Sequence, residues 1–189
     1  MSLSEYRALK EWASVVRALD EGKQALLLRK GGIAEKEQEF RLKHLRFLLF
    51  PTYEHQDETS FQPEYRRYIR ESESLKLDED VIQLTNFATV EEVFELSALD
   101  RARALSKYHI WSDQFVKMKF NYRQEKPLNV MTLRVYRLPQ STPVKVTSKY
   151  RGCLSWINLD TPIPTNGSRP VLDDAQFSRV GTEIRECVS

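Results

Sequence analysis

The segment Val130-Met-Thr-Leu-Arg-Val-Tyr-Arg-Leu138 alternates apolar and polar side chains along its length. This period of two is typical of a β-strand with one buried face and one polar face. We therefore expect a long half-buried strand here. The expected buried face carries Met131, Leu133 and Val135, and the opposite face carries Thr132, Arg134 and Tyr136.

The residues around this strand predict further strands and several helices. A proline pair, Pro139 and Pro143, brackets a turn, after which the chain is expected to pair back. Other strand-sized apolar runs are Ala25–Arg29, Phe40–Phe50, Val81–Phe87 and Leu154–Leu159. Helices are expected over Ser4–Leu19, Pro63–Ser72, Asp100–Lys107 and Ser112–Tyr122, and after a capping box formed by Thr89 and Glu92.

The order of these elements indicates the fold class. Strands and helices do not alternate as they do in a doubly wound parallel sheet. The pattern favours an α+β fold with a mixed, mainly antiparallel curved sheet or a small β-barrel, flanked by helices. Residues 1–160 are expected to form a single domain. Residues 161–189 are rich in Pro, Gly and Ser at their start and predict a linker followed by a loose tail.

Composition excludes several classes of protein. The 189 residues include 29 Lys and Arg against 27 Asp and Glu, a formal net charge of +2, which argues against a uniformly basic nucleic-acid binder. Two cysteines, Cys153 and Cys187, give no disulfide framework and no zinc-ligand spacing. No metal site and no cofactor are expected. No apolar run has the ~20 residues that span a bilayer, and the first residues lack a secretory signal. The expected compartment is the cytoplasm, without a membrane partner.

The densest group of candidate functional residues lies in the segment Leu26–Gln56, which carries many cations and two of the three histidines. The glycine amides after Arg29 and Lys30 could bind a phosphate together with these cations, or this segment could be a turn with solvated charges. Glu54 and His55 could act as an acid–base pair or as metal ligands, with His44 near the same cleft. A structural turn at Glu54–His55 is the favoured alternative, because adjacent strand residues point to opposite faces.

Three other segments combine cations with aromatic side chains, as nucleic-acid surfaces do. Each of them could also be an ordinary solvated face. Together they favour nucleic-acid binding. The segments are Tyr65–Arg70, the polar face with Arg134 and Tyr136, and the helix with Lys117 and Lys119.

Four motifs resemble the family catalogued as domain of unknown function 1802. They are Ala8-Leu-Lys-Glu-Trp12, the run Leu26–Ile33, Phe47-Leu-Leu-Phe-Pro-Thr-Tyr-Glu-His-Gln56 and Tyr150-x-Gly-Cys-x-Ser-Trp156. The resemblance implies a bacterial protein and no assigned activity. Some similar proteins are associated with restriction-endonuclease-like domains, which suggests a link to DNA.

The opening of the chain also resembles ASCH domains of the PUA-like superfamily, which are small β-barrels often linked to RNA. Their pattern is G-x-K-x-x-E-x-R. Gly22 and Arg29 match it, whereas Gln24 and Leu27 replace the lysine and the glutamate. This departure argues against inherited catalysis and leaves shape-based nucleic-acid binding open.

Three hypotheses of function follow. The first is a nucleic-acid-associated binding module that uses Arg29, Lys30, Arg46 and Arg134. The second is a hydrolase or nuclease of a restriction-type system that uses His44, Glu54 and His55. The third is a protein-interaction module without catalysis.

Overall fold

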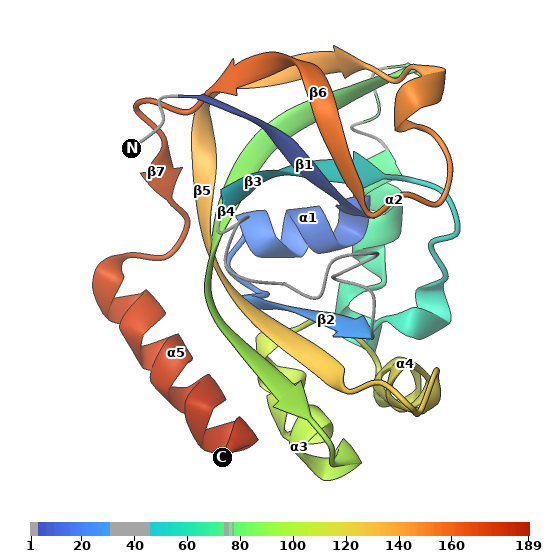
Figure 1. Ribbon diagram of the computed structural model, residues 1–189, viewed down its shortest axis with the longest axis vertical. Helices are drawn as coiled ribbons and strands as arrows, with labels where there is room; N and C mark the ends of the chain where they lie inside the picture. Colours follow the sequence, from blue (N-terminus) through green and yellow to red (C-terminus); the bar gives the residue numbers. More distant parts are fainter. Residues whose placement is uncertain (1–3, 31–45, 74–75, 77) are drawn as a thin grey trace.

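The β-strands of this protein form one strongly curved sheet (Figure 1). The computed structural model describes residues 4–30, 46–73, 76 and 78–189. In these residues the sheet has seven strands, in the order β2-β5-β4-β3-β1-β6, and β7 pairs with β5. The strands are β1 (Ser4–Trp12), β2 (Leu26–Lys30), β3 (Arg46–Thr52), β4 (Val81–Leu96), β5 (Leu128–Lys145), β6 (Trp156–Pro164) and β7 (Arg169–Pro170).

Five α-helices accompany the sheet within the described residues. They are α1 (Ala13–Asp20), α2 (Arg67–Glu73), α3 (Leu99–Ala104), α4 (Asp113–Asn121) and α5 (Asp174–Val188). β1 and β3 run parallel, and the other pairs are antiparallel. The expected α+β class with a mixed, mainly antiparallel curved sheet is therefore confirmed.

The long pair β4–β5 produces the curvature. Its register shifts between Leu84 and Asn86 and again between Val90 and Glu92. Each shift is a bulge, which bends a strand and increases its twist. The pair consequently curls around α1, which Figure 1 shows enclosed between β3 and β2. The alternation that predicted β5 is confirmed, since Met131, Leu133 and Val135 are buried.

β3 has a hydrophobic cluster on each of its faces. Phe47 and Leu49 belong to the cluster that includes α1, β2 and β5. Leu48 and Phe50 belong to a second cluster with residues of β1 and β6. A strand covered on both faces has a continuous apolar run, as Phe47–Phe50 does. The first six residues of the expected strand Phe40–Phe50 lie outside the described residues.

The helix expected over Ser4–Leu19 begins only at Ala13. Residues Ser4–Trp12 form β1, whose Ala8 pairs with Leu48 of β3 and with Ile157 of β6. Ala8 and Leu9 are buried in different clusters, so both faces of β1 are covered. The helical prediction was wrong because it used local spacing, whereas pairing with strands far away in the sequence decides this segment.

The capping box expected at Thr89 and Glu92 does not open a helix. These residues continue β4, in which Thr89 pairs with Arg134 and Glu92 with Thr132. The Thr132 hydroxyl accepts a hydrogen bond from the backbone N–H of Glu92 (3.0 Å). A partner strand overrides the local preference, since strand pairing satisfies the same backbone groups that a cap would. By contrast, Ser112 does cap α4 by accepting from the N–H of Phe115.

The residues after Asp160 are ordered and packed, contrary to the loose tail that the sequence predicted. β6 extends to Pro164, and α5 starts with a capping box between Asp173 and Gln176. Ile184 of α5 is 1% exposed and belongs to the main core. The weak apolar content was misleading because a helix needs only one apolar stripe to dock. Within the described residues, no helix combines the length and hydropathy that crossing a bilayer requires.

Candidate nucleic-acid interface

The four motifs of the family resemblance meet at Lys10 and Glu11 of β1. The Lys10 ammonium donates to the carbonyls of Tyr150 (2.9 Å) and Gly152 (2.8 Å). The Glu11 carboxylate pairs with Arg29 (2.9 Å), and its carbonyl accepts from the Thr52 hydroxyl (3.2 Å). The motifs are thus joined by side-chain contacts that hold β1, β2, β3 and the turn before β6 together.

Gln56, at the end of the third motif, caps α1 although it lies far from this helix in the sequence. Its side-chain oxygen accepts hydrogen bonds from the backbone N–H (3.1 Å) and from the hydroxyl of Ser14. Trp12 at the N-cap position supplies no side-chain cap of its own. This amide therefore satisfies a backbone donor that the first turn of a helix leaves without a partner.

Glu54 and His55 form the exposed turn before Gln56. His55 has a positive φ of 61°, which is a turn conformation rather than a strand. Neither side chain makes a hydrogen bond or ion pair with another described residue, and His44 lies outside the described residues. The structure therefore gives Glu54 and His55 no shared geometry for acid–base chemistry.

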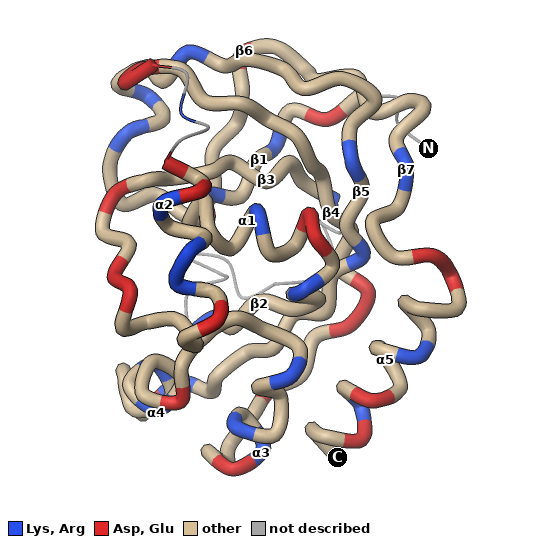
Figure 2. The backbone as a smooth tube through the Cα atoms, turned by 180° about the vertical axis from the view of Figure 1, so that it is seen from behind, with Lys and Arg blue, Asp and Glu red and all other residues tan. Residues whose placement is uncertain are grey.

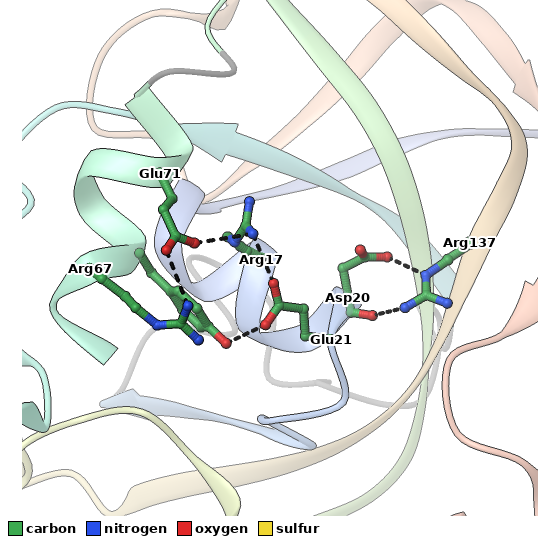
Figure 3. A network of polar contacts seen from close by, with 7 residues as sticks. Arg17, Asp20, Glu21, Arg67, Glu71 and Arg137 are labelled. Atoms are coloured by element: carbon green, nitrogen blue, oxygen red, sulfur yellow. Dashed lines mark hydrogen bonds and ion pairs between the residues drawn. The ribbon is translucent and has the colours of Figure 1, made fainter. Parts of the chain in front are cut away.

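Arg67 and Tyr68 of the segment Tyr65–Arg70 make contacts within the molecule, whereas Arg66 and Arg70 are exposed. Arg17 of α1 pairs with Glu21 (3.0 Å) and with Glu71 of α2 (3.1 Å), and Arg67 also pairs with Glu71 (3.2 Å), as Figure 3 shows. The buried Tyr68 hydroxyl donates to Glu21, and burial followed by this carboxylate raises the pKa of Tyr68. This network joins α1 to α2 and leaves a balanced charge. It is a structural contact between the two helices.

Arg46 and Arg134 come together on one face of the sheet. Thr89 pairs with Arg46 in β3 and with Arg134 in β5, so all three side chains lie in one row across the sheet. Arg134 pairs with Asp174 at the start of α5 and lies over the rings of Tyr136 (5.8 Å) and Phe177 (5.2 Å). Arg46 donates to the Thr165 hydroxyl and lies over Phe87 (4.4 Å). The charge of Arg134 is therefore already matched by a carboxylate.

Arg29 and Lys30 lie elsewhere, in a cavity beside α4 that we call the α4 pocket. Its volume is about 320 Å³. Side chains from β1, β2, α4, β5 and the start of β6 form its walls. The lining residues are Leu9, Arg29, Lys30, Phe115, Met118, Lys119, Tyr122, Met131, Ser155 and Trp156.

Three cations of this pocket differ in how they are held. Arg29 pairs with Glu11, and Lys30 donates to the carbonyl of Phe120 (2.7 Å). Lys119 forms no ion pair among the described residues and lies over the rings of Phe115 (5.1 Å) and Trp111 (5.7 Å). Burial, with the charge of Arg29, lowers the pKa of Lys119 to about 8, and the Glu11 carboxylate opposes this shift. The pocket thus holds more positive charge than its own carboxylates balance.

The aromatic wall of the pocket extends from the core to the surface. Phe61, Trp111 and Phe115 are stacked, with ring centroids 5.3 and 4.4 Å apart. Trp156 is packed edge-on against Phe47, at 5.1 Å. At the rim, Met118 and Tyr122 are more than half exposed. Exposed apolar side chains beside cations are typical of a binding surface.

The four basic residues of the nucleic-acid hypothesis therefore separate into two groups, Arg29 with Lys30 and Arg46 with Arg134. Figure 2 shows cationic and acidic positions interspersed along α2, α3 and α5. Sequence reasoning noted Lys119 only as charge on a helix, and it missed the pocket residues Tyr122 and Trp156. The contacts that unite them join residues far apart in the chain, so no local motif could have marked them.

Comparison with known proteins identifies a family model that matches the chain and solved structures that are similar to it. No curated protein matches the chain. Similar solved structures include the crystal structure of ASCH from Zymomonas mobilis, with 14% identity, a TM-score of 0.44 and coverage of 97% of this chain and 95% of that chain. A serine-to-alanine mutant of that ASCH protein has 13% identity and a TM-score of 0.46, covering 96% and 98%. The model of the family described as Domain of unknown function (DUF1802) matches residues 8–183, and the chain belongs to this family.

Proposed function

We propose that this protein is a cytoplasmic nucleic-acid-associated binding module and that the α4 pocket is its binding site. The observation that carries the proposal is the convergence of Arg29, Lys30 and Lys119 on a cavity with an aromatic wall. Nucleic-acid sites need both groups, because cations bind phosphates and aromatic rings stack on bases.

Lys119 is the group that points most directly to an anionic ligand. A partly buried ammonium without a carboxylate partner is costly to hold in a folded protein. A phosphate entering the pocket would restore the lost solvation and would offset the repulsion from Arg29. Arg46 and Arg134 contribute a second basic position in this proposal, but Arg134 already forms an ion pair with Asp174.

The test is a salt titration of binding to a fluorescently labelled single-stranded RNA and to a DNA strand of the same sequence. Wild type should bind with an affinity that falls steeply as salt rises. Lys119→Met should weaken binding and reduce the salt slope by about 0.7, the value for one phosphate contact on a single strand. Lys117→Met is the matched control, because Lys117 is on the same helix, exposed, and outside the pocket lining.

Two outcomes would contradict the proposal. The first is no binding of either strand at low salt. The second is equal loss of binding in the Lys117 and Lys119 variants, which would indicate diffuse attraction to α4 and no role for the pocket. A protein-interaction module remains the second candidate, because the exposed Met118 and Tyr122 at the rim also suit an apolar partner.

A further inference from the structure

We propose that the α4 pocket receives one unpaired base, stacked on Tyr122, with an adjoining phosphate at Lys119, so that the ligand is a single strand and not a duplex. This inference rests on the proposed function and names the class of nucleic acid that the pocket accepts. The volume of the cavity, the exposure of its aromatic rings and the contacts of its cations each support it.

The dimensions of the cavity fit one nucleotide unit. A volume of about 320 Å³ is at the lower end of the range of small-ligand pockets. A base inside a duplex is stacked on both faces and paired along one edge, so only its groove edges can be read. Such a base can enter a pocket only after it has left the helix, at the cost of its stacking and pairing. A cavity of this size therefore favours strands whose bases are already unpaired.

Among the aromatic side chains of the pocket, Tyr122 is the one with a ring open to a ligand. Phe115 is stacked on Trp111 at 4.4 Å, and Trp156 is packed on Phe47 and lies under the guanidinium of Arg7 (5.0 Å). Tyr122, by contrast, is 56% exposed, at the rim where α4 ends. The guanidinium of Arg123 lies 5.2 Å from its ring. An exposed ring flanked by a cation is a suitable platform for a base.

Among the cations, Lys119 is the one available to a phosphate. Arg29 is engaged by Glu11 and by the carbonyl of Lys10 (3.3 Å), and Lys30 by the carbonyl of Phe120. Within the described residues the Lys119 ammonium forms no ion pair or hydrogen bond. It contacts two rings, and Glu11, which is already paired with Arg29, attracts it only at longer range. Tyr122 follows Lys119 by three residues, at the end of the same helix. Residues three apart lie on one helix face, which brings a base platform and a phosphate contact to the same side of α4.

The experiment compares three labelled RNAs at one low salt concentration. The first is an intact strand of about 12 nucleotides, a length that falls within the site sizes of proteins that bind single strands. The second is the same strand with its bases removed, and the third is the intact strand annealed to its complement. The base-free strand keeps every phosphate, so it separates base binding from phosphate binding. Each RNA is titrated with wild type, with Tyr122→Leu and with Tyr6→Leu. Tyr6 is the matched control, since it is 55% exposed and does not line the pocket.

Wild type should bind the intact strand about 5- to 150-fold more tightly than the base-free strand, the range for one base stacked on an aromatic ring. The duplex should also bind more weakly than the intact strand. Tyr122→Leu should remove most of the preference for bases while leaving the affinity for the base-free strand unchanged, and Tyr6→Leu should keep the preference.

Equal binding of the intact, base-free and duplex RNAs would overturn the inference while nucleic-acid binding itself stands. The inference also fails, again without affecting nucleic-acid binding, if Tyr122→Leu retains the full preference for bases. If wild type binds none of the three RNAs, the proposed function fails, and this inference fails with it.

Discussion

The Arg29 guanidinium in β2 and the Glu11 carboxylate in β1 form an ion pair of 2.9 Å, although three strands separate β2 from β1 in the sheet. The pair is possible because β4 and β5 curl the sheet until its distant strands face each other. The side chains are only 20% and 13% exposed, so water screens this pair weakly. Arg29 therefore serves the fold as well as the pocket.

This pair predicts strong coupling between the two positions. Arg29→Ala leaves a partly buried carboxylate without its partner, so it should lower the free energy of unfolding by about 1–3 kcal/mol. Arg29→Met combined with Glu11→Leu should cost less than the sum of the single changes. A double-mutant cycle from urea unfolding measures the difference, expected at about 0.5–3 kcal/mol. Additive effects would contradict the pairing. For the same reason, Arg29→Ala is a poor test of ligand binding.

Lys119→Met should stabilise the protein while weakening ligand binding. Burial, with the charge of Arg29, lowers the pKa of Lys119 to about 8 in the folded state, against about 10.4 for an unfolded chain. The unfolded state thus binds this proton more tightly, so the lysine reduces stability at pH 7, and stability recovers as pH rises from about 8 to 10.4. Removing it should add about 1–2 kcal/mol at pH 7, after allowing for partial exposure and lost ring contacts.

The measurement is the difference in unfolding free energy between Lys119→Met and wild type at several pH values. The other titratable groups are the same in both proteins, so their contributions cancel in this difference. The gain should shrink as pH rises through the window from about 8 to 10.4. Lys117→Met, exposed on the same helix, should show no such trend. A gain that does not change with pH would rule out titration of Lys119 as its cause.

Gln56→Ala should destabilise the protein by about 0.5–2 kcal/mol, the usual cost of losing a helix cap. The reason is that the Gln56 oxygen accepts from the Ser14 N–H (3.1 Å) in the first turn of α1. Gln56→Glu keeps an acceptor and places a negative charge at the helix N-terminus, so it should recover most of the loss. Thermal unfolding followed by circular dichroism compares the three proteins. Equal losses in both variants would show that capping is not the role of Gln56.

Ile184→Ala should lower the free energy of unfolding by about 2–5 kcal/mol, because it leaves a cavity in the core under α5. Urea unfolding measures the loss, with Glu186→Ala, an exposed change on the same helix, as a control that should have little effect. A loose tail would give small effects for both. The pairs Arg134–Asp174 and Lys107–Glu183 also join α5 to the rest of the chain, but ion pairs at the surface contribute little to stability.

The correct sequence predictions are those whose cause is local. β5 was predictable because its alternating side chains have one buried face, and the start of α4 was predictable because Ser112 caps it. Arg29 and Lys30 were recognised as neighbouring cations, and they lie at the end of β2. Glu54 and His55 were offered as acid–base candidates or turn residues, and the positive φ of His55 favours the turn.

The other features depend on partners that sequence spacing does not reveal. Ser4–Trp12 is a strand because it pairs with β3 and β6. Thr89–Leu96 is a strand because it pairs with β5. The weakly apolar α5 is ordered because the core accepts Ile184.

The sequence by itself determined the fold class, the family motifs and the presence of the neighbouring cations Arg29 and Lys30, since these follow from residue type and short-range period. Only the tertiary structure decided where the motifs meet and which cation of the pocket forms neither an ion pair nor a hydrogen bond within the described part of the chain. The physical reason is the curl of the β4–β5 pair. It brings Glu11 of β1 to Arg29 of β2. Lys119 of α4 and Tyr122 at the end of that helix lie beside Arg29 and line the same pocket.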